Sequence, residues 1–401
     1  MLPEGWNQLR LGNIFKFKNG LNGDSSLYGS GAKFVNVMDV FRGPRLRHHE
    51  IIGEMIATAK QLDEFGIKFG DVLFNRTSET DDEIAFATVY LDDKPAVFGG
   101  FVIRARPTDV SLTPEFCTYV FQSAFIRRSM IRLGQGAIRS NIGQGDLTTV
   151  PIKFPPIAEQ RRIAEILSTW DRAIAVQEQL VANARAQKKG LMQTLLTGTK
   201  KRLPGFKGEW KTRKFANIAS LAKERVDTTS LPPGARGIEL EHIESETGSL
   251  LGFAEANQQL SLKTPFNTNH VLYGKLRPYL RKFLKPTFSG VASTEIWVLI
   301  ASRKLCSPEF LYFLVQSPGF EAVVDMSAGS KMPRADWDVV KDAPFLIPEL
   351  DEQSAISNVL EASEILVRNL QARVRQLQQE KSALMQQLLT GKRRVKVEAQ
   401  A

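Results

Sequence analysis

The stretch "MQTLLTG" occupies residues 192–198, and "MQQLLTG" occupies residues 385–391. The two copies differ at one letter, lie 193 residues apart, and each leads into a basic run, at residues 200–202 and 392–394. Agreement at a fixed offset is the signature of a duplicated structural unit, so the extent of the repeat decides the fold.

The repeat extends far upstream of this phrase. Glu159 and Gln160 correspond to Glu352 and Gln353, and "TPEFCTYVFQS" (residues 113–123) matches "SPEFLYFLVQS" (residues 307–317) after a one-residue change of offset. The sequence therefore predicts a globular part of about 150 residues followed by a segment of about 40 residues, present twice. Agreement is strongest in the shorter segments.

Each shorter segment has the heptad pattern of a helix that packs against another helix. Prolines stand just before each segment (Pro155, Pro156, Pro348), and Gly198 and Gly391 stand where a helix would end. The predicted seam positions are Ile163, Leu167, Trp170, Ile174, Gln177, Val181, Ala184, Lys188, Leu191 and Leu195 in the first copy, and Ile356, Leu360, Ser363, Val367, Leu370, Val374, Leu377, Lys381, Leu384 and Leu388 in the second.

Two helices of equal length with matching seams are expected to pack together. If a twofold axis relates the halves, the helices run antiparallel, each about 60 Å long, with the globular parts at opposite ends. The alternative is two independent helices, each packed on its own globular part. The equivalent seam lysines, Lys188 and Lys381, would fix register at a cost in stability.

The predicted fold class is therefore α+β, with two mixed α/β globular domains and a two-helix antiparallel coiled coil, related by a pseudo-twofold internal repeat. The predicted boundaries are residues 1–156 (first domain), 157–199 (first helix), 200–349 (second domain), 350–391 (second helix) and 392–401 (basic tail). Residues 32–41, 70–77, 96–107, 269–276 and 293–302 are expected to contain strands, and residues 114–134 and 308–329 helices, the latter broken near Pro318.

Charge points to an anionic partner. The net charge is +10, and residues 157–214 alone carry +8, whereas both globular parts are nearly neutral. Concentrated basic charge favours nucleic acid, although a solvated surface is the alternative for any single run.

Basic clusters in the globular parts are the candidate contacts to DNA, because Arg and Asn can pair with base edges while Lys and hydroxyls more often hold phosphates. A turn cap is the alternative for Asn75 and Arg76. The candidates are Arg42, Arg45, Arg47, Asn75, Arg76, Arg139, Ser140 and Asn141 in the first domain, and Lys275, Arg277, Arg281, Lys331 and Arg334 in the second.

Signals for catalysis and for the membrane are missing. The sequence has no P-loop, no metal-ligand spacing among its four histidines and two cysteines, and no apolar run of 18 residues. Two cysteines and a first stretch without a secretion-signal layout indicate a cytoplasmic protein. The missing catalytic motifs indicate that the chain has no chemistry of its own.

The two repeated segments resemble a known protein family. "VPIKFPPIAEQRRIAEIL" (residues 150–167) and "APFLIPELDEQSAISNVL" (residues 343–360), each leading through a long helix to "LLTG", resemble the two conserved regions of type I restriction–modification specificity subunits. "RLPGFKGEW" (residues 202–210) and "GDVLFNRTSE" (residues 70–79) are also similar to that family. The second copy departs from it by having Glu349 in place of the second proline.

The resemblance implies that each globular domain is a target recognition domain for one half of a bipartite, asymmetric double-stranded DNA sequence. The helices would set the gap and dock two methyltransferase subunits, and restriction subunits would join them. S-adenosylmethionine, and ATP with Mg²⁺ for restriction, would belong to those partners. The alternatives are a coiled-coil scaffold without a DNA role and a specificity subunit of another methylation system.

Overall fold

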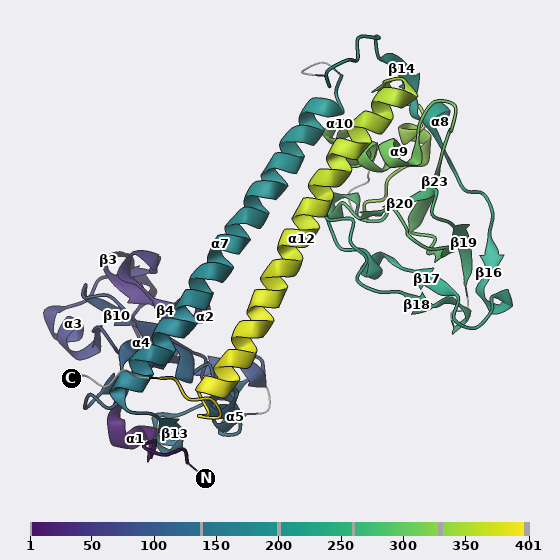
Figure 1. The fold of residues 1–401 in the computed structure, drawn as a ribbon. Helices are drawn as coiled ribbons and strands as arrows, with labels where there is room; N and C mark the ends of the chain where they lie inside the picture. Colours follow the sequence, from purple (N-terminus) through teal and green to yellow (C-terminus); the bar gives the residue numbers. More distant parts are fainter. Residues whose placement is uncertain (1, 137–138, 199–201, 259–260, 328–331, 397–401) are drawn as a thin grey trace. The chain divides into compact units, whose positions relative to one another are not determined.

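The computed structural model describes residues 2–136, 139–198, 202–258, 261–327 and 332–396. The chain divides into two compact units, the first made of residues 1–177 and 373–401, and the second of residues 178–372. The long helices α7 (Ile157–Leu195) and α12 (Leu350–Leu388), of 39 residues each, contribute one part to each unit (Figure 1).

The first unit contains a five-stranded sheet of order β2-β11-β7-β9-β4 and a four-stranded sheet of order β5-β3-β10-β6, beside the strand pairs β1–β13 and β8–β12. Its elements other than the long helices are β1 (Asn7–Arg10), α1 (Leu11–Ile14), β2 (Phe15–Asn19), β3 (Tyr28–Val35), α2 (Val37–Phe41), β4 (Arg45–Leu46), β5 (Glu54–Met55), α3 (Ala59–Phe65), β6 (Gly66–Ile67), β7 (Val72–Asn75), β8 (Thr77–Ser78), β9 (Ala87–Tyr90), β10 (Ala96–Phe98), β11 (Val102–Pro107), α4 (Pro114–Val120), α5 (Ala124–Ile131), β12 (Ser140–Asn141), α6 (Gln144–Thr149) and β13 (Pro151–Phe154).

The second unit contains a four-stranded sheet of order β15-β23-β20-β21 and a five-stranded sheet of order β16-β19-β22-β17-β18, beside the pair β14–β24. Its elements are β14 (Lys211–Lys214), α8 (Phe215–Ile218), β15 (Ala219–Leu221), β16 (Val226–Asp227), β17 (Arg236–Ile238), β18 (Ala254–Glu255), β19 (Leu262–Phe266), β20 (His270–Gly274), β21 (Phe283–Leu284), β22 (Gly290–Ala292), β23 (Ile296–Ala301), α9 (Pro308–Leu314), α10 (Pro318–Ser327), α11 (Trp337–Val340) and β24 (Pro344–Ile347).

The two units share one topology. The antiparallel run β2-β11-β7-β9 in the first has its counterpart in β15-β23-β20-β21 in the second. The parallel pair β3–β10 corresponds to the parallel pair β17–β22. The mixed α/β class and the internal repeat expected from the sequence are confirmed.

Two expected elements differ from the structure. Residues 32–41 form the end of β3 and then helix α2, because the Asn36 side chain accepts the Met38 N–H at 2.8 Å and caps that helix. Residues 114–134 form two helices rather than one, because Ser123 caps a second start at α5. The break expected at Pro318 is present between α9 and α10.

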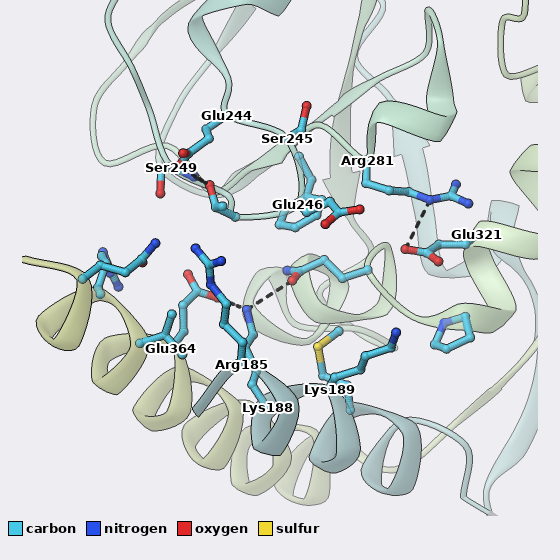
Figure 2. Close-up of a pocket in the computed structure, with 18 of the residues that line it drawn as sticks. Arg185, Lys188, Lys189, Glu244, Ser245, Glu246, Ser249, Arg281, Glu321 and Glu364 are labelled. Atoms are coloured by element: carbon cyan, nitrogen blue, oxygen red, sulfur yellow. Dashed lines mark hydrogen bonds and ion pairs between the residues drawn. The ribbon is translucent and has the colours of Figure 1, made fainter. Parts of the chain in front are cut away.

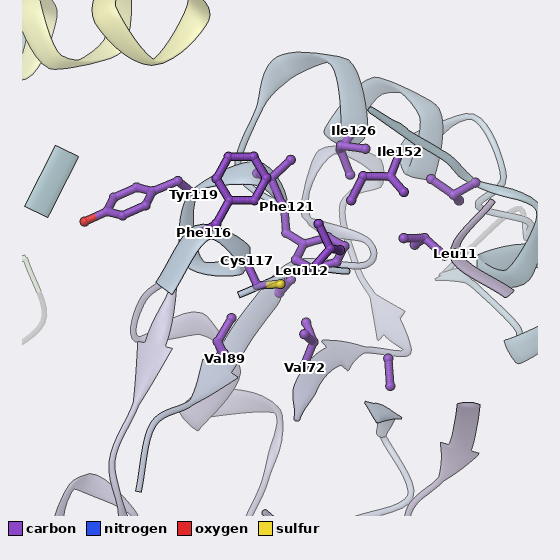
Figure 3. Packing of buried hydrophobic residues seen from close by; sticks show 14 of the residues in the cluster. Leu11, Val72, Val89, Leu112, Phe116, Cys117, Tyr119, Phe121, Ile126 and Ile152 are labelled. Atoms are coloured by element: carbon purple, nitrogen blue, oxygen red, sulfur yellow. The ribbon is translucent and has the colours of Figure 1, made fainter. Parts of the chain in front are cut away.

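Each hydrophobic core incorporates the start of one long helix and the end of the other. The core of the first unit joins Ile163 and Leu167 of α7 to Leu388 of α12, and the core of the second joins Ile356 of α12 to Leu195 of α7. Figure 3 shows the first core around Phe116 and Cys117 of α4. Because the end of α12 packs into the first core, the interpretation as two independent helices is wrong.

The twenty predicted seam positions are all buried or half-buried. In the first unit the seam lysine Lys381 forms an ion pair with Asp171, which also accepts a hydrogen bond from the Tyr119 hydroxyl at 2.7 Å. Figure 3 shows that Tyr119 points away from the other labelled core residues.

The second unit repeats this crossing between the helices. Lys188 forms an ion pair with Glu364 at 2.8 Å, and Glu364 accepts the Tyr312 hydroxyl at 3.0 Å. The lysine and glutamate side chains are only 13% and 16% exposed. Burial and the adjacent carboxylates raise the pKa of both tyrosines, so the hydroxyls remain donors.

The repeated Glu-Gln pair closes the helix ends. The Glu159 carboxylate, at the start of α7, accepts hydrogen bonds from both Nε and Nη2 of Arg394, each at 2.8 Å. Arg394 lies just past the end of α12. Twelve residues after Glu159, Asp171 of α7 pairs with Lys381 of α12. Since Lys381 comes before Arg394 in the chain, the two helix parts run antiparallel in this unit. In the second unit Glu352 binds Arg202 in the same bidentate way.

The buried glutamines anchor the helix starts. Gln160 accepts the Thr113 N–H at 2.9 Å and donates to the Pro155 carbonyl at 2.9 Å. Gln353 makes the equivalent bonds to Ser307 and Pro348, also at 2.9 Å. The sequence repeat is thus explained by two copies of one anchoring geometry.

The glycine of each "LLTG" is predicted to be required for stability. Gly198 and Gly391 have φ of +67° and +71°, and an added Cβ would lie 2.6 Å from Trp210 and 2.3 Å from Pro3 respectively. We expect Gly198→Ala and Gly391→Ala each to lower the free energy of unfolding by about 1–3 kcal/mol. Thermal unfolding would measure this.

Gly190→Ala is the matched control, because Gly190 lies inside α7 with no atom within 4 Å of its added Cβ. It should raise stability by about 0.5–1 kcal/mol. Equal effects at all three glycines would contradict the helix-stop role.

Candidate nucleic-acid interface

In the first unit, two of the stretches singled out in the sequence meet at one strand end. The chain leaves β7 at Asn75, and β8 then pairs antiparallel with β12, which places Thr77 opposite Asn141. The Thr77 hydroxyl bonds to the Asn141 side chain at 3.0 Å, and the Ile142 N–H donates to the Arg76 carbonyl at 3.0 Å. Arg76, Arg139 and Asn141 therefore belong to one surface, which we call the first strand-end site.

The second unit builds an equivalent surface. At the end of β20 the Ala335 N–H donates to the Lys275 carbonyl at 2.8 Å, as Ile142 does to Arg76. Leu276 forms a bridge with Arg334, and the Arg277 N–H donates to the Pro333 carbonyl at 2.7 Å. Lys275, Arg277 and Arg334 form the second strand-end site.

The charges of these surfaces are only partly neutralised. Arg139, 61% exposed, pairs with Glu79 at 3.2 Å, and Arg334 pairs with Glu295 at 3.1 Å. Within the parts of the chain that the structure describes, no hydrogen bond or ion pair is made by the side chains of Arg76, Lys275 or Arg277. These three cations are available to an anionic ligand.

Three sequence candidates are corrected by their surroundings. Asn75 is fully buried, donates to the Thr77 carbonyl at 3.3 Å and accepts the Phe86 N–H, so it is the turn cap that was the alternative. Ser140 is buried and donates to Asp81. Arg281 is held by Asp325 and Glu321. None of the three presents a free group to DNA.

The cluster Arg42, Arg45 and Arg47 lies on and beside β4, at the edge of the first unit's five-stranded sheet. Arg42 donates to the Glu50 carbonyl, and Arg45 is paired with Asp171 of α7. Arg45 thereby supports the helix crossing. Lys331 lies outside the described residues.

Sequence reasoning missed the acidic and phenolic partners of the seam lysines. Asp171 and Glu364 lie 193 residues apart, so the repeat offset could have identified them. The tyrosines could not be found in this way: under the offset of this segment Tyr119 corresponds to Phe313, and the hydroxyl comes instead from the neighbouring Tyr312.

A cavity of about 530 Å³ lies in the second unit beside the Lys188–Glu364 pair. Figure 2 shows Arg185, Lys188 and Lys189 of α7 on one side and the loop with Glu244 and Glu246 on the other. Opposite charges face each other across this space, so the lining does not select one sign of ligand.

Two kinds of reactive group, metal-ligand clusters and cysteine thiols, can be assessed within the described residues. No group of three or more His, Cys, Asp and Glu side chains there could hold a metal ion. Burial raises the pKa of the Cys117 and Cys306 thiols, which disfavours the thiolate that a nucleophile needs. In the same parts of the chain, no helix is both long and apolar enough to cross a bilayer.

Comparison with known sequences finds similarity to one family. A model described as the type I restriction modification DNA specificity domain matches residues 3–184. The chain is 22% identical to the putative type I restriction enzyme MjaX specificity subunit of Methanocaldococcus jannaschii, over 98% of this chain and 95% of that protein. It is 24% identical to the EcoDI specificity subunit of Escherichia coli, over 61% of this chain and 64% of that protein.

Residues 3–184 thus match the DNA specificity domain of type I restriction–modification systems, and the chain as a whole is similar to specificity subunits of that type. The fold agrees with solved structures. A chain from a study of complex assembly and conformational transition of the type I R-M system has a TM-score of 0.60 at 16% identity, covering 98% of this chain and 99% of that one. The S subunit from M. genitalium has a TM-score of 0.55 at 15% identity, with 96% of each chain covered.

In the first unit, Asn75 is predicted to act on stability rather than on DNA. We expect Asn75→Ala to lower the free energy of unfolding by about 1–3 kcal/mol, because it removes a fully buried amide that accepts the Phe86 N–H and donates to the Thr77 carbonyl. Thermal unfolding would measure the loss.

The neighbouring Arg76→Ala is the control, since its half-exposed side chain should change stability by no more than about 0.5 kcal/mol. An Asn75→Ala protein of unchanged stability that no longer binds DNA would restore Asn75 as a candidate DNA contact.

Proposed function

We propose that this chain is the DNA-recognition subunit of a type I restriction–modification complex, in which each globular domain reads one half of a bipartite, asymmetric DNA target. The long helices set the gap between the half-sites and dock two methyltransferase subunits. The chain performs no chemistry of its own.

The observation that carries this proposal is the pair of strand-end sites. They have the same backbone construction, with one N–H donated to the carbonyl of Arg76 or Lys275. Their side chains differ: Arg76, Arg139 and Asn141 in one, and Lys275, Arg277 and Arg334 in the other. Equal scaffolds with unequal donors are what reading two different short sequences requires.

The helices have the properties of a spacer. Each is a continuous helix of 39 residues, about 58 Å at 1.5 Å per residue. The ion pairs at Lys188 and Lys381 fix their register, and a fixed register would convert helix length into a fixed gap on the DNA.

Partners and cofactors follow from this role. Two methyltransferase subunits would carry S-adenosylmethionine, and restriction subunits would carry ATP and Mg²⁺. The duplicated helices offer two related surfaces, which suits two copies of one partner. Exposed apolar side chains on α12, such as Ile365 and Leu366, could contribute to such contacts.

Removing a cation from either strand-end site is expected to weaken DNA binding. For Arg139→Ala and Lys275→Ala we expect lower affinity at low salt. We also expect a plot of log affinity against log salt that is shallower by about 1 for each phosphate that the variant no longer neutralises. Binding titrations at several salt concentrations, with the methyltransferase partner present, would measure both quantities.

Lys214→Ala is the control, because Lys214 is an exposed lysine of the second unit on β14 and is already paired with Asp342 at 2.9 Å. It should leave the slope unchanged. If Arg139→Ala and Lys275→Ala behave as Lys214→Ala does, the strand-end sites do not face DNA.

Lengthening both helices is expected to lengthen the gap. Seven residues inserted after Gln177 in α7 and after Leu370 in α12 keep both lysine pairs and the heptad phase. The insertion adds about 10.5 Å, or about three base pairs. Target selection should then return the same half-sites at a wider spacing.

The same heptad inserted into α7 alone is the control, since it breaks the match between the two seams and should lower thermal stability. Altered half-site sequences at an unchanged gap in the doubly extended protein would refute the spacer role.

A further inference from the structure

The segment of residues 275–282, "KLRPYLRK", is a strained turn at the second strand-end site. Arg277 and Arg281 have φ of +51° and +48°, a left-handed conformation that residues with a Cβ rarely adopt. Between them lies a single 3₁₀ turn, Pro278–Leu280. Two such residues four positions apart persist only where the surroundings enforce them, and such strain is concentrated at functional sites.

The surroundings hold this turn at both ends. On the entry side, the Arg277 N–H donates to the Pro333 carbonyl at 2.7 Å. On the exit side, Arg281 bonds to Asp325 of α10 at 3.1 Å and pairs with Glu321 at 3.5 Å, and Figure 2 shows this side chain directed toward Glu321. The Lys282 amine donates to the Leu240 carbonyl at 2.8 Å.

This framework exposes one aromatic ring. Of the aromatic residues interleaved with the basic residues here, Tyr273 and Phe283 are buried, whereas Tyr279 is 56% exposed. Pro278, just before it, is buried and anchors the turn. Tyr279 lies two residues from the unpaired cation Arg277, so a bound phosphate backbone would bring the ring close to the bases.

We propose that Tyr279 is a DNA-contacting residue of the second domain whose ring stacks against the bases of its half-site. This inference rests on the proposed function and adds to it a non-ionic contact. A rigid, partly apolar ring held beside cations is suited to insert between two base pairs. Such insertion unstacks the bases and bends the duplex, and its energetic cost depends on the sequence, which adds specificity.

The contact is specific to the second domain. The corresponding connection of the first unit, residues 76–86 between β7 and β9, carries the acidic residues Asp81, Asp82 and Glu83, and its one aromatic residue, Phe86, is half-buried against Phe41. Loss of the ring should therefore change recognition of one half-site and leave the other unaltered.

The test uses the full chain with its methyltransferase partner and duplexes retained from a random-sequence pool. Tyr279→Ala should lower affinity about tenfold and leave the salt slope and the thermal unfolding temperature unchanged. A 2-aminopurine probe placed in the second half-site should lose its fluorescence response. Tyr279→Phe, which keeps the ring, should behave as the wild type.

Leu251→Ala is the control, since it truncates another exposed apolar side chain of the same unit. Wild-type affinity and probe response in Tyr279→Ala, with sequence-specific binding by the unaltered protein, would overturn the stacking role alone. Equal losses in the Ala and Phe variants would overturn it in favour of a hydroxyl–phosphate contact. Absence of specific binding by the unaltered protein would instead refute the proposed function.

Discussion

The ion pair between a seam lysine and a carboxylate of the facing helix is the constraint on which both units depend. Lys188 with Glu364, and Lys381 with Asp171, are each held by a tyrosine hydroxyl from the adjoining domain, so one cluster joins two helices and a domain. Such a pair contributes little net stability because desolvation offsets attraction, but leaving one charge unpaired costs about 3–5 kcal/mol. A shift in register would leave both lysines unpaired. The pairs therefore specify the alignment of the helices, while apolar burial at the helix ends supplies the stability.

Duplication and divergence act on different parts of this molecule. The Glu-Gln pairs, the arginines that bind their glutamates and the glycines that end the helices serve the same geometry twice, so they are kept in both copies. The strand-end sites share backbone construction and differ in side chains, and of the two turns beside them only the second exposes an aromatic ring, that of Tyr279. Shared geometry with altered donors is how one fold can serve two different sequence preferences.

The sequence predicted the elements whose physical signals are local and repeated. Heptad spacing located α7 and α12, and the left-handed glycines marked their ends. The predicted basic stretches also proved to meet in pairs, at Arg76 with Ile142 and at Lys275 with Ala335. Spacing alone could not show which side chains are already engaged in hydrogen bonds or ion pairs within the protein. Asn75 and Arg76 are neighbours in the chain, yet one is buried in a cap and the other is available, because Asn75 ends the fully buried strand β7 and Arg76 begins the turn that follows it. The partners of Arg281 lie some 40 residues away on α10, beyond any local pattern.

The most direct test of the account is a selection from random-sequence duplexes by this chain, co-purified with the methyltransferase that accompanies it in its own cell. Two recognition domains held by helices in fixed register should retain DNA with two short, different motifs separated by a constant gap. A single motif, or binding that depends on salt but not on sequence, would contradict bipartite recognition and favour a scaffold role for the helices.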